Sequence, residues 1–379
     1  MSGRVLFHVQ YLLGIGHLQR SLRIAEALAA RGIAVTLVQG GPAVPEVARA
    51  CDIDILQLPP IRARDATFAL VDDAGNPVDD ALRAARRDRL LTIFADQLPD
   101  AVVIEGYPFA RRAFRFELDP LIAAAREAGS RVICSVRDIP TVRNDPQHHQ
   151  DIVARVRRDF DAVLVHGDRN FILFDVPFPP APQIADRLVY TGYVAAPVKP
   201  APDAALPEGE ILISVGGGGE AGRALLSTAL DARRQGCQVG RPWRVLTGAT
   251  LADDAFAALQ RSAPDGVVLE RFRADFPALL RRCHVSVSQA GYNTVLDILA
   301  AGARAVLVPF SAERETEQLV RAEHLARIGA AELLRESDLT PAHLARAIER
   351  AAARDPLPVA INTGGAARSA AEIARLIGK

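Results

Sequence analysis

The sequence predicts an α/β protein made of two doubly wound, Rossmann-like domains. Short apolar runs rich in β-branched residues alternate with amphipathic helical patterns along most of the 379 residues. A chain of this length exceeds one ordinary core, and the alternation stops once, at the proline-rich segment 191–210, before it restarts. Apolar strands separated by helices indicate parallel sheets covered on both faces, and two such domains are expected to face an interdomain ligand cleft.

The first half of the chain carries the first run of alternating elements. Helical periodicity is clearest at residues 20–31, and a second helix is expected at 121–129. Strands are expected at residues 5–10, 34–38, 101–104, 131–135 and 162–166. These elements define an N-terminal domain at residues 1–195, followed by a hinge at 196–209.

The second half repeats this architecture without repeating the sequence. Strands are expected at residues 211–215, 244–246, 267–270, 285–288 and 304–308, and helices at 222–234, 294–301 and 318–328. They define a C-terminal domain at residues 210–360. A last helix at 366–377 belongs to a separate segment, 361–379, which can pack back on the N-terminal domain.

The composition excludes several classes of protein. The 45 basic and 45 acidic residues cancel, which argues against nucleic acid as the main partner. None of the four cysteines stands in a metal-binding or disulfide pattern, so reduced thiols are expected. We find neither a secretory leader nor an apolar run near the roughly 18 residues of a membrane span. A cytoplasmic protein is expected, with peripheral contact to the inner face of the membrane left open.

The first motif, "GIGHLQRS", lies between the first expected strand and the helix that follows it. The dinucleotide fingerprint GxGxxG would need a third glycine at Gln19, so a dinucleotide site fits poorly. His17 lies on the turn itself, where it is either a catalytic group facing the cleft or only part of a solvated helix start.

The second motif is a run of four glycines after the strand at 211–215. A loop without side chains lets the backbone approach a phosphate or a sugar closely, and the alternative is a flexible connection. The candidate phosphate ligands here are Gly216, Gly217, Gly218 and Gly219.

The third motif runs from the strand at 285–288 into a helix, with the sequence "VSVSQAGYNTVLDILAAG". A helix N-terminus presents free N–H groups and partial positive charge, which suit a diphosphate. The candidate diphosphate ligands are Ser288, Gly291, Tyr292, Asn293 and Thr294. Asp297 could accept from a ribose diol, and Glu317 with Gln318 could bind sugar hydroxyls. Taken individually, Asp297 could instead only complement the helix dipole, and Glu317 could only belong to the solvated start of a helix.

The third motif resembles the nucleotide-sugar half of GT-B glycosyltransferases, most closely glycosyltransferase family 28, which includes the UDP-N-acetylglucosamine transferase of peptidoglycan lipid synthesis. The pattern Ser-x-x-Gly-x-x-Thr-x-x-acidic, then Ala-Gly, Val-Pro and a glutamine, matches from Ser288 to Gln318. By this resemblance Asp297 takes the ribose-binding position, Phe272 and Arg273 belong to the loop whose backbone contacts uracil, and Glu317 and Gln318 contact the donor sugar.

The N-terminal motif also resembles that of the UDP-sugar hydrolase of pseudaminic acid synthesis, another GT-B-like enzyme. This resemblance implies that His17 lies beside the anomeric carbon as a base or site organiser. Gly16 is then expected to let the backbone approach the bound sugar.

The acceptor side is less well defined. The stretch "EGYPFARRAFRFELDP" interleaves aromatic and arginine side chains, and the segment 107–116 is either core, acceptor site or membrane contact. Tyr107, Arg137 and Asp138 are candidate acceptor-side residues, whereas His148 and His149 are expected in a solvated loop. The hinge lacks the arginine typical of family 28, so the peptidoglycan lipid is not the expected acceptor.

These features together predict a metal-independent glycosyltransferase. It would move a hexose or N-acetylhexosamine from a UDP-sugar to an unidentified acceptor, small or lipid-linked, with His17 as the base. The candidate donor site holds no Asp-x-Asp metal motif, and no cofactor besides the UDP-sugar is expected. A UDP-sugar hydrolase or epimerase and a non-catalytic nucleotide-sugar sensor are the alternatives.

Overall fold

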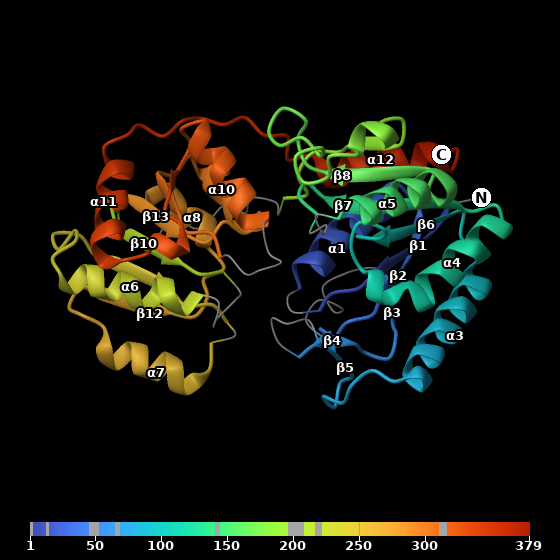
Figure 1. The fold of residues 1–379 in the computed structure, drawn as a ribbon, viewed down its shortest axis with the longest axis horizontal. Helices are drawn as coiled ribbons and strands as arrows, with labels where there is room; N and C mark the ends of the chain where they lie inside the picture. The colour runs from blue at the N-terminus through green and yellow to red at the C-terminus, as the bar shows by residue number, and fades with distance from the viewer. Residues whose placement is uncertain are drawn as a thin grey trace. The chain divides into compact units, whose positions relative to one another are not determined.

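The computed structural model divides the chain into two units, each described here by itself. It describes residues 3–12, 15–44, 53–64, 69–140, 145–195, 208–216, 222–249, 251–310 and 317–379. Unit 1 comprises Met1–Ala196 together with Ile361–Lys379, and unit 2 comprises Pro197–Ala360 (Figure 1).

The described residues of unit 1 form a seven-stranded sheet in the order β3-β2-β1-β6-β7-β8-β9. Every neighbouring pair in this sheet is parallel. The strands are β1 (Arg4–Val9), β2 (Ala34–Gln39), β3 (Asp54–Gln57), β6 (Ala101–Glu105), β7 (Arg131–Arg137), β8 (Ala162–His166) and β9 (Leu188–Tyr190). A short antiparallel pair, β4 (Arg62–Ala63) and β5 (Leu70–Val71), stands apart.

Helices cover both faces of this sheet. The helices are α1 (Gly16–Ala29), α3 (Asp80–Gln97), α4 (Arg115–Glu127), α5 (Pro146–Asp159) and α12 (Gly365–Leu376). Side chains of α1 and α12 pack in one core cluster, and those of α3, α4 and α5 pack in another. The strands alternate between the two, because Leu6 belongs to one cluster and Phe7 to the other. The sheet is therefore buried on both faces, as the continuous apolar strands predict.

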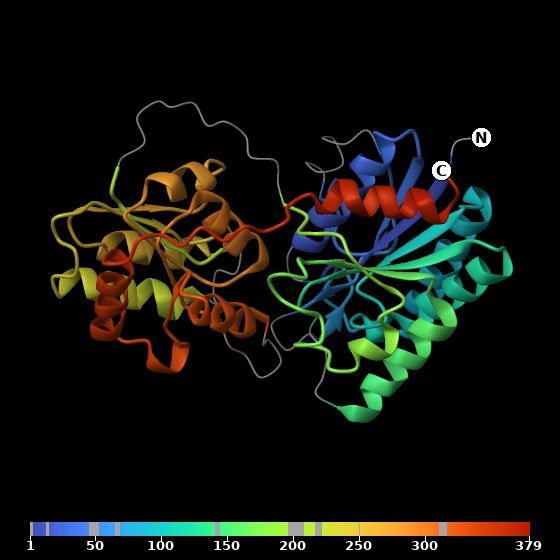
Figure 2. The same cartoon turned by 90° about the horizontal axis from the view of Figure 1, so that it is seen from above.

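The last helix, α12, belongs to unit 1 because the chain returns to pair with the segment after β9. Tyr193 N donates to Asn362 O at 2.6 Å, and Gly365 N donates to Tyr193 O at 3.1 Å. A Cβ atom at Gly365 would lie 2.4 Å from the carbonyl oxygen of Gly192, so only glycine fits this crossing. From there α12 packs along α1 (Figure 2).

The described residues of unit 2 form a six-stranded parallel sheet in the order β12-β11-β10-β13-β14-β15. The strands are β10 (Ile211–Ser214), β11 (Trp243–Leu246), β12 (Val267–Glu270), β13 (Val285–Ser288), β14 (Ala305–Leu307) and β15 (Glu332–Leu333). The helices are α6 (Arg223–Arg234), α7 (Asp253–Ser262), α8 (Phe276–Arg282), α9 (Tyr292–Ala301), α10 (Glu317–Arg327) and α11 (Pro341–Ala352).

Two expectations about local structure are wrong. The helix expected at 121–129 begins at Arg115, so Pro120 lies within it, in its second turn. His148 and His149 are buried on α5 and not solvated in a loop. The Asp145 side chain accepts from the N–H groups of Gln147 and His148, so the Asp-Pro sequence begins a helix where it suggested a turn.

Candidate functional site

Each sheet has one topological switch point, where successive connections leave in opposite directions. In unit 1, β1 pairs with β2 on one side and with β6 on the other. In unit 2, β10 pairs with β11 and with β13. Ligands of open α/β sheets bind at the carboxyl ends of the strands that flank such a point. His17 follows β1, Gly216 follows β10 and the third motif follows β13, so each motif has described residues at a switch point.

In unit 1 the switch point brings His17 against Glu105, the last residue of β6. His17 Nδ1 lies 2.7 Å from Glu105 Oε1. Arg20, one turn further along α1, donates from Nη2 to the same carboxylate oxygen at 2.6 Å and lies 3.0 Å from His17 Nδ1. Glu105 is buried, whereas the His17 side chain is 26% exposed. The imidazole therefore has one buried partner and one accessible edge.

The carboxylate determines which nitrogen of His17 can act as a base. Although burial opposes ionisation of Glu105, hydrogen bonding to His17 and the charges of Arg20 and Arg111 hold its pKa well below its ordinary value. An ionised carboxylate only accepts hydrogen bonds, so the proton of the neutral imidazole lies on Nδ1. Nε2 is then the proton acceptor. Burial lowers the pKa of His17 to about 4, against the opposing effect of Glu105, so the ring is neutral at pH 7.

Arg111 is aimed at the same carboxylate by an unusual backbone conformation. Its φ of 61° is left-handed, and Gly106, the residue after Glu105, has a φ of 80°. The two turns bring Arg111 Nη2 to 3.7 Å from Glu105 Oε2. Burial, and then the positive charges of Arg137 and Arg20, lower the pKa of Arg111, although Glu105 opposes them. Arg20 and Arg111 thus contact one glutamate at this switch point, and the charge of Arg137 acts on Arg111.

A second buried group of polar side chains lies at the ends of β7 and β8. Ser135 Oγ lies 2.7 Å from His166 Nε2, and Thr191 Oγ1 lies 3.0 Å from His166 Nδ1. Burial lowers the pKa of His166 to about 3. All three side chains are buried, so they brace the strand ends and cannot reach a substrate directly.

The acceptor-side candidates lie near this edge, but two of them are enclosed. Asp138 is buried and accepts from the Tyr193 hydroxyl at 3.0 Å. Tyr107 is also buried, and its hydroxyl contacts Asp119 and Arg155. Arg137 ends β7 and is half-buried.

The aromatic–arginine stretch at 107–116 contributes its rings to the core. Tyr107, Phe109 and Phe114 are each 1% exposed, and Phe116 packs partly buried against the same cluster. Phe109 meets Phe174 and Phe178 edge-on, with ring centroids 5.1 and 5.2 Å apart. These rings therefore do not form a surface patch.

In unit 2 the third motif builds the expected strand-to-helix turn. Gly291 is the N-cap of α9, with extended backbone geometry and no side-chain cap, and no acidic residue occupies the first turn. The N–H groups of Tyr292, Asn293 and Thr294 belong to this first turn, where an anion can accept from them. Ser288 is buried, with its Oγ 2.9 Å from Ser286 Oγ.

The glycine run is described only at its first residue. Gly216 has a left-handed φ of 63°, and a Cβ atom added there would meet nothing within 4 Å. Gly217, Gly218 and Gly219 lie outside the described residues. Because β10 and β13 are neighbours, with Ser214 opposite Ser288, Gly216 lies at the same switch point as the start of α9.

The nucleoside candidates occupy different positions. Phe272 is 70% exposed just beyond β12. Arg273 turns back on its own loop: it donates twice to Asp275, at 2.7 Å each, and once to Glu270 at 3.1 Å. Its guanidinium therefore stiffens the loop that carries Phe272. Asp297 is half-buried on α9.

Of the three sugar candidates, Gln318 contacts the turn before α9. Gln318 Oε1 accepts from the N–H groups of Ala290 and Phe310, at 3.1 Å each. Glu317 is buried and accepts from Arg321 Nη2 at 2.8 Å. Gly16 begins α1, with nothing within 4 Å of an added Cβ atom.

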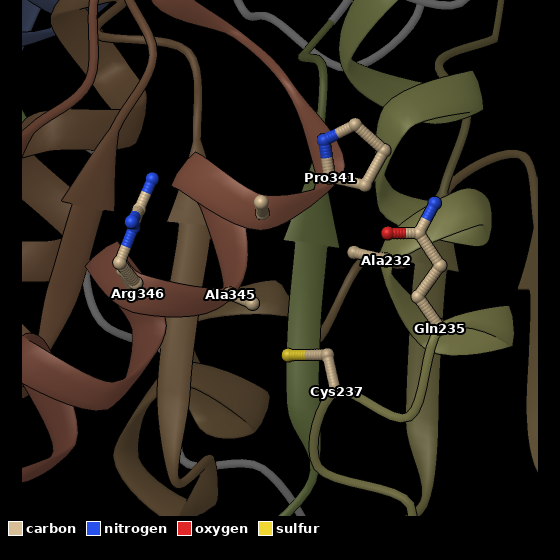
Figure 3. Close-up of a pocket in the computed structure, with 7 residues that line it drawn as sticks. Ala232, Gln235, Cys237, Pro341, Ala345 and Arg346 are labelled. Carbon is tan, nitrogen blue, oxygen red and sulfur yellow. The ribbon is translucent and has the colours of Figure 1, made fainter.

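A cavity of about 310 Å³ lies elsewhere in unit 2, between the end of α6 and the start of α11 (Figure 3). Its lining includes Cys237 and Pro341. Because α6 runs from the carboxyl end of β10 to the amino end of β11, this cavity lies at the sheet edge opposite the switch point. The described residues contain no group of three or more potential metal ligands. Within them, no helix is long and apolar enough to cross a membrane.

Comparisons with known proteins find relatives among glycosyltransferases. Residues 212–376 match the family model described as the glycosyltransferase family 28 C-terminal domain. A Zymomonas mobilis protein named UDP-N-acetylglucosamine–N-acetylmuramyl-(pentapeptide) pyrophosphoryl-undecaprenol N-acetylglucosamine transferase is 26% identical, over 90% of this chain and 84% of its own. A Rhodopseudomonas palustris protein of the same name is 29% identical, over 76% of this chain and 72% of its own.

Solved structures show the same fold. MurG from Acinetobacter baumannii aligns with a TM-score of 0.60 at 20% identity, covering 98% of this chain and 95% of its own. The calicheamicin glycosyltransferase CalG4 aligns with a TM-score of 0.63 at 19% identity, covering 100% and 94%.

The match to the family 28 domain, together with the fold, indicates a nucleotide-sugar-dependent glycosyltransferase of the GT-B class. Within that class the chain resembles glycosyltransferase family 28, and the match to the family's C-terminal domain confirms this part of the sequence prediction.

Sequence reasoning missed Glu105, Arg20 and Arg111. The one available signal for Glu105 was an acidic residue at the end of an otherwise apolar strand.

Proposed function

We propose that this chain transfers an N-acetylhexosamine or hexose from a UDP-sugar to an acceptor hydroxyl, with His17 as the general base. The observation that carries the proposal is the 2.7 Å contact between His17 Nδ1 and the buried Glu105 at the switch point of unit 1. A buried carboxylate that fixes the tautomer of a partly exposed histidine is the arrangement a general base requires.

Unit 2 would bind the donor. The diphosphate would accept from the N–H groups at the start of α9, whose fixed dipoles oppose the charge that develops on it. The acceptor oxygen would lose its proton to His17 Nε2 and form a bond to the anomeric carbon. The bond from that carbon to the diphosphate oxygen would break, and UDP would leave with its electron pair.

Two observations support a lipid-linked acceptor that carries an anionic group. Arg20, Arg111 and Arg137 outnumber the two carboxylates Glu105 and Asp138 at the ends of β6 and β7, so this edge of unit 1 favours negative charge. The related proteins are named for acceptors that carry a pyrophosphoryl-undecaprenol group. The core position of the rings in segment 107–116 favours a contact through arginines over one through aromatic side chains.

A ligand-dependent melting screen tests the donor. UDP and UDP-sugars are expected to raise the melting temperature more than GDP, ADP or dTDP and their sugars. UDP release is then measured with a lipid-diphosphate-linked sugar and with the same sugar lacking the lipid diphosphate. Transfer only to the neutral soluble sugar would contradict the acceptor proposal, and no response to any UDP compound would contradict the whole proposal.

A further inference from the structure

Two side chains near the start of α10 contact the turn before α9, and a third side chain pairs with one of them. Glu317, Gln318 and Arg321 lie within the first five residues of this helix. Polar atoms of Gln318 and Arg321 reach the peptide groups before α9, and Glu317 pairs with Arg321. Arg321 is 1% exposed, and its Nη1 donates to Ala290 O at 2.9 Å. Its guanidinium also lies over the Tyr292 ring, 5.7 Å from the centroid.

Both polar backbone groups of Ala290 are therefore held by side chains of α10. Gln318 accepts from its N–H, and Arg321 donates to its C=O. Ala290 is fully buried, so neither group has water as an alternative partner. The orientation of this residue is fixed from two sides.

The fixed carbonyl sets the direction of the next N–H group. In a trans peptide the C=O of one residue and the N–H of the next point in opposite directions. Because Arg321 draws the Ala290 C=O into the interior, the Gly291 N–H points the other way. Among the described residues no backbone carbonyl accepts from this N–H. It belongs to the N-cap of α9, beside the first-turn amides of the candidate diphosphate site.

A gain in stability does not explain why the ion pair between Arg321 and Glu317 is buried. Removing an arginine and a carboxylate from water is expensive, and apolar residues of similar volume often serve a core equally well. Arg321 with Glu317, at 2.8 Å, instead gives an orientation that an apolar pair cannot give. A carbonyl turned toward a diphosphate would repel it, whereas an N–H attracts it.

We propose that Arg321 is a positioning residue for the donor diphosphate: by holding the Ala290 carbonyl inward, it turns the Gly291 N–H toward the anion at the start of α9. This inference rests on the proposed donor site. Glu317 neutralises the buried guanidinium, and Gln318 fixes the other end of the same residue.

The test compares affinity for UDP with affinity for uridine, which lacks the diphosphate. In Arg321→Met, loss of one hydrogen bond to a charged group is expected to weaken UDP binding about tenfold while uridine binding stays unchanged. Because this variant leaves Glu317 buried without its ion-pair partner, the double variant Glu317→Gln/Arg321→Met is measured alongside it. Arg327→Met, an exposed position on the same helix, is the matched control and should change neither affinity.

The outcomes separate the inference from the proposed function. If the wild-type chain binds UDP, and both Arg321 variants lose UDP and uridine affinity by the same factor or lose neither, the positioning role is wrong and the donor site stands. If the wild-type chain does not bind UDP, the donor site is wrong and this inference falls with it. Fluorescence of Trp243, the single tryptophan and a buried residue of unit 2, shows whether each variant is folded.

Discussion

Oε1 of Glu105 lies 2.7 Å from Nδ1 of His17, although 88 positions separate the two residues in the chain. The contact exists because β1 and β6 are neighbours at the switch point of unit 1. The first ends before the turn that carries His17, and the second ends in Glu105. Arg20 completes the group from the next turn of α1.

Replacement of Glu105 by glutamine should slow sugar transfer without weakening the binding of the UDP-sugar donor. Glutamine keeps the volume but removes the charge that orients His17 and stabilises its protonated form. The expected loss is about 100-fold in kcat, within the usual contribution of general-base catalysis. Steady-state kinetics and UDP titration measure the two effects. Glu127→Gln, an exposed position on α4, is the control; equal kcat in both variants would refute the role of Glu105.

The pH dependence of transfer follows from the pKa of His17, which burial lowers to about 4. A general base acts in its neutral form, which prevails above that pKa. We expect kcat/KM to rise with pH up to about 5 and then to stay level to pH 8. A rising limb centred near pH 6.5, the ordinary histidine pKa, would show that His17 titrates as an unburied group.

His166 should make the stability of unit 1 depend on pH. Its pKa is about 3 in the folded chain and about 6.5 when unfolded. Between these values the unfolded state binds a proton that the folded state does not, so stability falls as pH falls below about 6.5. The free energy of unfolding should fall by about 2 kcal/mol between pH 7 and pH 5, because it falls by about 1.4 kcal/mol per pH unit below about pH 6.5.

Urea unfolding followed by circular dichroism measures this loss in the wild-type chain and in His166→Gln. The variant has no imidazole to protonate, so its stability should change less over the same interval, although its stability at pH 7 is lower. Equal slopes in the two proteins would show that His166 does not contribute.

A buried ion pair between α3 and α4 should matter for stability and not for chemistry. Arg86 donates to both oxygens of Glu117 at 2.7 Å and to the backbone oxygen of Gly40 at 2.9 Å. Both side chains are fully buried. Arg86→Met should therefore lower the free energy of unfolding by about 3–5 kcal/mol, because it leaves the buried Glu117 carboxylate charged and without its arginine partner.

The double variant Arg86→Met/Glu117→Gln should recover part of this loss. Arg83→Met, a half-exposed position on the same helix, should cost less than about 1 kcal/mol. A double variant no more stable than Arg86→Met would argue that the loss comes from packing and not from the stranded carboxylate.

The sequence predicted the elements well where their signal is local. The strand expected at 162–166 is β8, and those at 267–270 and 285–288 are β12 and β13. Apolar runs and helical periodicity are properties of neighbouring residues, so they can be read without the fold.

Partners that come from distant segments were not predictable in this way. Glu105 comes near His17 only because β6 pairs with β1. Arg111 comes near Glu105 only because its own backbone is left-handed. Glu317 looked like a group open to sugar hydroxyls, but the structure adds a buried partner, Arg321, one turn further along the helix. Its role toward the donor sugar stays a prediction, as do the roles of Asp297 and Phe272.

The central claim is that His17 removes the acceptor proton while unit 2 binds the donor. The most direct measurement is UDP release from a UDP-sugar by His17→Ala and by the wild-type chain, with donor affinity determined for both. The account predicts unchanged donor affinity and transfer reduced at least about 100-fold, within the contribution expected of a general base. Undiminished transfer by His17→Ala would contradict it.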